Sequence, residues 1–499
     1  MAGIGFELKK LFRRQSLTAK FSAVLYSVFS TIGHLLVVIG ALISVKLFLL
    51  NSDMPLDDQR LYSSIILYSF VFPLIFTSGL CIIISRYLAD MMWQDKTEDI
   101  LASVYGALVV YCSLASIPAV ILLWQAQLGL ILSVFAYLLY MMVGIIFILM
   151  VYVSALKDYA QISRSFILGM VVAFVGSFLT VRLSGLQASM TTALVGSFAV
   201  GMTLVAAGVL MGVKKYFRVP STHYFDFLIY MGKYPSLFWF NTFYTLGIYV
   251  QNFIFWGYYK TQNSISVFIF SDDFDMATAL GVLTILPAIV LFVVRMETSF
   301  YDYFREYLRA VNTLTGAEIE KAKGLMKRRM WQEFFFVAEL QILISLVSVV
   351  VGIAVLPLVG LSATIVEIFP NMVAGFLFTY FMFLACTLMQ YFENYVDCLR
   401  IMVLFLLLNT IFTVLTAQLG AEFYGVGIVF ASTVSLIAAL LYLRKTLDSV
   451  DYIIFCSRVP EEESKGRNLE SLINRLNGQE DVKQGNENLS QSQRQTADS

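Results

Sequence analysis

Long apolar runs separated by short polar segments account for most of this 499-residue chain. A helix needs about 20 largely apolar residues to cross the hydrocarbon core of a bilayer, and the chain offers about twelve such runs. We therefore predict an all-α, polytopic membrane protein with about twelve transmembrane helices. The predicted spans are residues 21–45, 61–84, 101–123, 128–153, 165–181, 190–212, 236–256, 277–294, 333–356, 364–388, 399–418 and 423–443.

The composition supports this reading, because 59% of the residues are hydrophobic and only 14% are charged. Soluble domains hold about 45–50% apolar and about 25% charged residues. A water-soluble fold could not bury the excess of apolar side chains. We therefore expect part of the surface to contact the lipid bilayer.

Basic residues divide the predicted loops into two classes. All but four of the 34 Lys and Arg residues fall on segments that would share one side of the membrane. Cytoplasmic loops are enriched in Lys and Arg, so we predict that both termini are cytoplasmic. The four exceptions are Lys46, Arg60, Arg182 and Lys260.

The same pattern suggests four parts of the chain. Residues 1–20 mix apolar and basic side chains, as expected for a cytoplasmic interfacial amphipathic helix. Residues 21–217 would form an N-lobe with spans one to six. Residues 218–455 would form a C-lobe with spans seven to twelve and a long cytoplasmic loop, 295–332, that is charged and helix-prone. Residues 456–499 are polar, and we expect a largely disordered cytoplasmic tail.

Motifs for catalysis are missing from the sequence. It has no GxxxxGK[ST] loop, no HExxH motif and no CxxC pair, and it has only two histidines. The acidic stretch at 272–275 lies on the predicted outer side, where no nucleotide-sugar donor is present. We expect neither an enzyme nor a cofactor, metal site or nucleic-acid partner.

Polar residues inside or beside the spans are candidates for a transport path, because ionisable groups are costly at membrane depth and tend to face a cavity or a partner. Each also has a structural alternative: hydrogen bonding between helices, snorkelling of a long side chain, or a local ion pair. The candidate path residues are His34, Lys46, Arg182, Gln251, Asn252, Arg295, Glu297 and Glu339.

Charge clusters outside the spans suggest two further surfaces. Acidic residues on the predicted outer side would form an exit surface: Asp53, Asp57, Asp58, Asp272, Asp273 and Asp275. Basic residues in the long cytoplasmic loop would form a dock for a partner protein: Lys321, Lys323, Lys327, Arg328 and Arg329.

Several segments resemble the PelG family of exopolysaccharide exporters. Residues 1–11 (Met-Ala-Gly-Ile-Gly-Phe-Glu-Leu-Lys-Lys-Leu), 273–278 (Asp-Phe-Asp-Met-Ala-Thr) and 283–287 (Leu-Thr-Ile-Leu-Pro) carry the resemblance. So do residues 294–298 (Val-Arg-Met-Glu-Thr) with Phe300. Residues 390–393 (Gln-Tyr-Phe-Glu) match more loosely, since Asn394 and Tyr395 depart from the expected pattern.

This resemblance implies two six-helix lobes around a central cavity that opens alternately to each side of a bacterial inner membrane. The substrate would be a growing Pel-like glycan rich in N-acetylgalactosamine. It would be received from a cytoplasmic glycosyltransferase that works with other membrane and scaffold proteins. Two other functions stay open: an ion-coupled small-molecule antiporter of the same superfamily, and a membrane scaffold for the glycosyltransferase. The energy source, polymer elongation or an ion gradient, also stays open.

Overall fold

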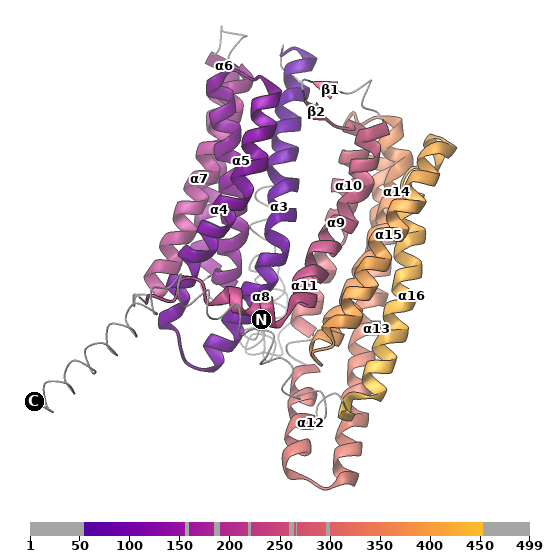
Figure 1. The fold of residues 1–499 in the computed structure, drawn as a ribbon. Helices are drawn as coiled ribbons and strands as arrows, with labels where there is room; N and C mark the ends of the chain where they lie inside the picture. Colours follow the sequence, from indigo (N-terminus) through magenta and orange to yellow (C-terminus); the bar gives the residue numbers. More distant parts are fainter. Residues whose placement is uncertain are drawn as a thin grey trace, which may run out of the picture.

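The computed structural model describes residues 54–154, 159–183, 190–217, 221–258, 264–265, 267–295 and 300–452. Within these residues the regular elements are helices, apart from a hairpin of β1 (Ser264–Ile265) and β2 (Phe268–Ile269). Figure 1 shows the long helices running side by side. They are α3 (Leu56–Trp93), α4 (Glu98–Ala126), α5 (Leu130–Ser154), α6 (Tyr159–Leu183), α7 (Met190–Tyr216), α9 (Pro235–Tyr258), α13 (Gly316–Val355), α14 (Ala363–Gln390), α15 (Tyr395–Leu419) and α16 (Val426–Asp448). The shorter ones are α8 (Phe227–Lys233), α10 (Asp272–Thr284), α11 (Leu286–Arg295), α12 (Tyr301–Thr313) and the 3-10 turn η3 (Ala421–Phe423).

Ten helical segments of the described chain are long and apolar enough to cross a membrane. They coincide with predicted spans two to six and eight to twelve, so the all-α polytopic class is confirmed. Such helices suit lipid because all their backbone hydrogen bonds are internal. Predicted span seven is the helix α9, which is rich in aromatic and polar residues and is not among the ten. Predicted span one, the interfacial segment 1–20 and the tail 456–499 lie outside the described residues.

The helices form two groups with separate buried cores. One core is built mainly from α3 to α7, which we call the N-terminal group. The other is built from α9 to α16, which we call the C-terminal group. Figure 1 shows the two groups side by side, in the colours of the two parts of the chain. Three residues of the second part, Phe227 of α8, Trp256 of α9 and Phe268 of β2, are buried in the first core and join the groups. Six helices in each lobe stays a prediction.

Span eight differs from the single helix predicted at 277–294. It consists of α10 and α11, which part at Ile285, just before Pro287. Proline lacks a backbone N–H and its ring clashes with the preceding turn, so a helix breaks there or starts anew. The hydroxyl of Thr284 donates a hydrogen bond to the carbonyl oxygen of Gly281 in the last turn of α10, at 2.7 Å.

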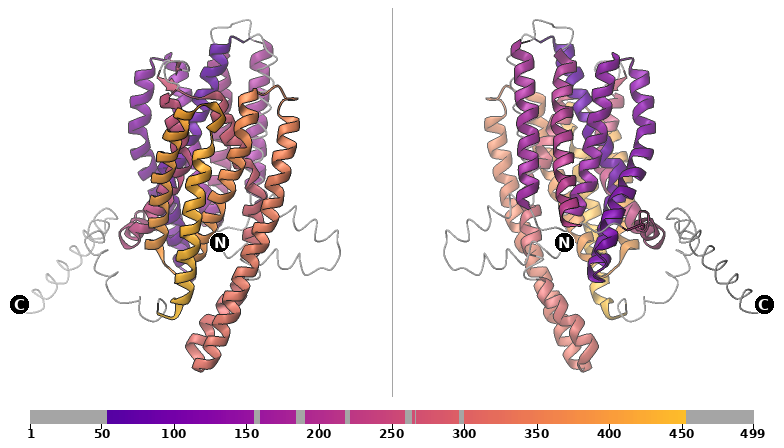
Figure 2. Two further views of the ribbon diagram at one scale, coloured as in Figure 1. Left: turned by 90° about the vertical axis from the view of Figure 1, so that its right-hand side faces the viewer. Right: turned by 90° about the vertical axis from the view of Figure 1, so that its left-hand side faces the viewer.

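The predicted cytoplasmic loop 295–332 is largely helical. It contains α12 and the first part of α13, which starts at a capping box formed by Thr315 and Glu318. This box satisfies backbone donors of the first turn that have no partner inside the helix. The views in Figure 2 show the first part of α13 projecting beyond the other helices. The loop is thus a helical hairpin, which we call the α12–α13 hairpin.

Candidate transport seam

The two helix groups meet where α3 contacts α8, α9 and the β1–β2 hairpin, and we call this contact the seam. Asn241 donates a hydrogen bond from Nδ2 to the carbonyl oxygen of Ser78 at 2.7 Å. Beside it, a Cβ atom at Gly79 would lie 2.5 Å from Oγ1 of Thr242 and 2.6 Å from the ring of Phe238. The two helix groups therefore lie close together here, because Gly79 has no side chain and Asn241 makes a hydrogen bond between them.

Tyr68 of α3 bridges the seam at the end that bears the β1–β2 hairpin, which the charge pattern assigns to the outside. Its hydroxyl donates to the carbonyl oxygen of Ile269 at 2.9 Å and accepts from the Ile269 backbone N–H at 3.1 Å. Its ring stacks on Trp256 with 5.1 Å between centroids. The edge of Phe268 meets the same ring at 5.1 Å. One tyrosine thus holds both α9 and β2 against the N-terminal group.

A carboxylate lies directly behind this contact. Asp275 accepts hydrogen bonds from Nε1 of Trp256 at 2.9 Å and from Nδ2 of Asn252 at 2.7 Å. The backbone N–H of Ser271 donates to its other oxygen at 3.0 Å. These donors fix the indole that Tyr68 stacks on. Asn252, a predicted path residue, therefore has a positioning contact inside the C-terminal group.

Gln251 has a different environment from its neighbour Asn252. It is fully buried, and neither atom of its amide has a hydrogen-bond partner among the described residues. Burying an amide without a hydrogen bond costs about 1–3 kcal/mol. Gln251 thus keeps both a donor and an acceptor available within α9.

The opposite end of the seam carries an ion pair between the groups. Nη2 of Arg86 on α3 lies 3.1 Å from Oε1 of Glu393, which follows α14. The same guanidinium lies 3.7 Å from a carboxylate oxygen of Asp90 and 5.4 Å from the ring centroid of Tyr234. The Tyr234 ring meets that of Tyr395 edge-on at 5.6 Å. Both ends of the seam are thus bridged by polar and aromatic side chains.

Two other predicted path residues that the structure describes, Arg295 and Glu339, lie on α11 and α13, outside this contact. Arg295 ends α11, lies 3.7 Å from a carboxylate oxygen of Glu333 and sits 4.0 Å above the ring of Phe336. Glu339 is exposed on α13 and lines a shallow hollow with Arg328 and three aromatic side chains. Arg182 belongs to the last turn of α6. The predicted path residues His34, Lys46 and Glu297 lie outside the described residues.

The predicted exit acids have unequal environments. Asp57 is exposed and Asp58 half-buried, both in the first turn of α3. Asp272 of α10 lies 3.6 Å from Nε of Arg60 on α3, which adds a second ion pair between the two helix groups. Asp273 accepts a hydrogen bond from Ser362 at 2.7 Å. The last two are Asp275, held as described above, and Asp53, which lies outside the described residues.

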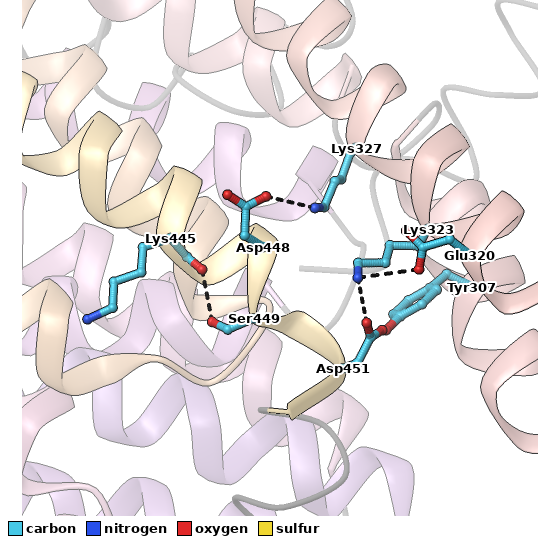
Figure 3. Close-up of polar contacts among 8 residues, drawn as sticks. All are labelled: Tyr307, Glu320, Lys323, Lys327, Lys445, Asp448, Ser449 and Asp451. Atoms are coloured by element: carbon cyan, nitrogen blue, oxygen red, sulfur yellow. Dashed lines mark hydrogen bonds and ion pairs between the residues drawn. The ribbon is translucent and has the colours of Figure 1, made fainter. Parts of the chain in front are cut away.

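Three of the five predicted docking residues are already paired within the chain. Figure 3 shows Asp448 and Asp451, at and beyond the end of α16, reaching the α12–α13 hairpin. Lys327 contacts Asp448 at 3.0 Å, and Lys323 contacts Asp451 at 2.5 Å. Arg329 contacts Glu333 at 2.8 Å. The remaining two, Lys321 and Arg328, are exposed and have no ion pair among the residues that the structure describes.

The contact of Asp448 and Asp451 with the α12–α13 hairpin, which we call the arm clasp, also shifts the pKa values of two side chains. Burial raises the pKa of the Tyr307 hydroxyl, and so does its 2.6 Å hydrogen bond to Asp451. Partial burial opposes ionisation of Asp451, but the hydrogen bonds from Lys323 and Tyr307 outweigh it and hold its pKa below the usual value. The carboxylate form is therefore the one that fixes the hairpin.

Reasoning from the sequence alone did not single out Tyr68, Asn241, Arg86 or Glu393. Arg86 counted only as a topological charge, and its partner lies 307 positions away in the chain. Glu393 entered only as part of a resembling segment. The one available signal was that Arg86 follows almost directly on the apolar run of predicted span two, where a charged side chain needs a partner or water.

Comparison with known proteins agrees with this architecture. The family model PelG, described as an exopolysaccharide exporter (EPS-E), matches residues 1–455. No curated protein matches the chain.

Solved transporters share the fold. An outward-facing multidrug resistance transporter of the MATE family and MOP superfamily matches with a TM-score of 0.59 at 12% identity, covering 85% of this chain and 96% of its own. A MOP superfamily transporter from Pyrococcus furiosus matches with a TM-score of 0.60 at 12% identity, covering 86% and 96%. An inward-facing MATE family transporter matches with a TM-score of 0.55 at 13% identity, covering 79% and 91%. At these identities the likeness shows the fold alone.

Proposed function

Because the chain belongs to the PelG family of exopolysaccharide exporters, we propose that it moves a growing polymer rich in N-acetylgalactosamine across the bacterial inner membrane. The polymer passes along the seam, and the protein makes or breaks no covalent bond. The seam carries this proposal, because α3 meets α9 and β2 there through directional hydrogen bonds and aromatic faces as well as apolar contacts.

Such a lining suits a glycan. Sugar hydroxyls donate and accept hydrogen bonds. The seam offers them the amide of Asn241, the phenol of Tyr68 and the backbone N–H and carbonyl of Ile269. Aromatic side chains such as Trp256 add an apolar face with a polar edge. When the groups separate, the polymer replaces the lost hydrogen bonds, so few buried polar groups stay unpaired.

The two ends of the protein fit a direction of transport. Asp57, Asp58 and Asp272 lie at the predicted outer end, where they would attract a polymer that becomes cationic after partial deacetylation. Such attraction acts over about 8–10 Å at physiological salt. The α12–α13 hairpin lies at the predicted cytoplasmic end, where its exposed Lys321 and Arg328 would dock the glycosyltransferase. Both termini would lie on that cytoplasmic side.

The test is polymer secretion by intact cells that carry the glycosyltransferase, with this gene deleted and then restored. Deletion should abolish secreted hexosamine polymer, scored by lectin, and restoration should recover it. Tyr68→Phe, which removes the hydroxyl that bridges the groups, should change secretion several-fold at equal protein level. Tyr62→Phe is the matched control on the same helix, because its buried hydroxyl has no hydrogen-bond partner in the described part of the chain.

Three results would count against the proposal. Secretion that survives deletion would exclude an essential role in export. Changed tolerance to toxic cations in the same strains would favour the small-molecule antiporter. Secretion that needs the protein but ignores Tyr68→Phe and Asn241→Ala would favour the scaffold.

A further inference from the structure

We infer that Arg86 and Glu393 form the latch that closes the predicted cytoplasmic end of the seam, and that this latch opens when substrate enters. The inference rests on the proposed function, since a path between the groups needs a closure that can be released. The pair joins α3 of the N-terminal group to the turn between α14 and α15 of the C-terminal group. It therefore spans the two separate cores.

The contact is built for release. One nitrogen of the Arg86 guanidinium meets one oxygen of Glu393 at 3.1 Å, whereas strong arginine–carboxylate pairs are usually bidentate. The side chains are 29% and 48% exposed, and partly exposed ion pairs contribute little to stability. Nε of Arg86 has no acceptor among the described residues. Such a pair can be made and broken in each cycle.

When Glu393 withdraws, Arg86 keeps two other partners, one on its own helix and one between α8 and α9. Asp90 lies one helical turn further along α3, at 3.7 Å. Tyr234, which lies between α8 and α9, offers its ring face to the guanidinium at 5.4 Å. A cation held by a carboxylate and an aromatic face does not become isolated when Glu393 withdraws.

The backbone of Glu393 takes a conformation that few residues with a side chain adopt. Glu393 has φ +58°, a left-handed conformation that is uncommon for residues other than glycine, asparagine and aspartate. Its N–H donates to the carbonyl oxygen of Gln390 at 3.1 Å, and the side chain of the next residue, Asn394, caps α15. A glycine would suit this conformation better. The carboxylate placed here points across the seam instead.

The experiment measures opening directly. A Ser78→Cys reporter is placed in a protein whose five cysteines are replaced by alanine. Ser78 is 5% exposed and lies on the seam beside Asn241, so the reporter thiol should react slowly while the seam is closed. A membrane-impermeant maleimide is added to inside-out membrane vesicles without glycosyltransferase or polymer. Glu393→Gln and Arg86→Gln should each raise the labelling rate about five-fold, and the double variant should add little more.

Asp397→Asn is the matched control. Asp397 lies only four positions after Glu393, but its ion pair with Arg400 at 2.6 Å stays inside α15. The control should leave labelling unchanged. Unchanged labelling in both latch variants, or an equal rise in the control, would overturn the latch. If labelling rises in the latch variants while polymer secretion proves independent of the gene, the latch stands and the export proposal fails.

Discussion

A methyl group added at Gly79 should push the two helix groups apart. The Cβ atom of alanine at this position would lie 2.5 Å from Oγ1 of Thr242, whereas ordinary contacts fall at 3.4–4 Å. Relief therefore requires α3 and α9 to separate by about 1 Å, or Thr242 and Phe238 to rotate away. Gly79 lies on the seam, so the first route would open the path between the groups.

The magnitude follows from overpacking. Forcing an extra methyl group into a close contact costs about 1–3 kcal/mol. If separation of the groups relieves that cost, the open state gains about 5- to 150-fold in population. Alanine also favours a helix interior over glycine by about 1 kcal/mol. Gly257→Ala is the control for this gain, because Gly257 is in α9 and has nothing within 4 Å of its added Cβ.

The assay is labelling of the Ser78→Cys reporter in inside-out vesicles, together with thermal unfolding of the purified protein in detergent. Gly79→Ala should label faster and should lower Tm relative to Gly257→Ala. If both quantities match those of the control, Thr242 and Phe238 rotate aside. The close approach at Gly79 then does not set the distance between the groups.

Four further results are expected. Asp451→Asn should speed hydrogen exchange in α12, because the hairpin loses the carboxylate that pairs with Lys323 and accepts from Tyr307; unchanged exchange would show that the arm clasp does not fix the hairpin. The same protection in the unsubstituted protein should depend on pH: since the folded-state pKa of Asp451 is lowered, its contribution is complete above the ordinary carboxyl pKa of about 3.9 and is lost as pH falls through the lower folded value. Protection, taken relative to the intrinsic exchange rate at each pH, that is lost only above neutral pH would contradict this sign. Asp275→Leu should lower Tm by several degrees, because Trp256 and Asn252 lose a shared acceptor, while Asp57→Leu, at an exposed site, should not. Lys321→Glu with Arg328→Glu should weaken salt-sensitive co-purification of the glycosyltransferase, with Arg400→Glu as the control on another exposed basic residue; equal recovery from all three proteins would remove the hairpin as the dock.

Much of the fold follows from the sequence, because lipid accepts few alternatives. A run of about 20 apolar residues must be helical to satisfy its backbone, so each predicted span in the described part of the chain is helical. Residues 1–11 and 273–278 carried the resemblance to the PelG family, which the match over residues 1–455 confirms. The break in span eight was not predicted, because the apolar run at 277–294 continues through Pro287 and whether a proline breaks a helix depends on local packing.

The candidate site depended on tertiary structure. Hydrophobic periodicity says how far a helix runs but not which helix it meets, so Tyr68 and the backbone of Ile269 had no visible relation across 201 positions. The charge pattern predicted the topology but not which charges pair. Lys323 and Lys327 lie in a stretch of basic residues, and only the folded chain brings Asp451 and Asp448 to them. Contacts between residues distant in sequence are fixed by the packing of whole helices. The sequence by itself therefore determined a multi-pass exporter of known family, and only the tertiary structure decided where its two groups touch.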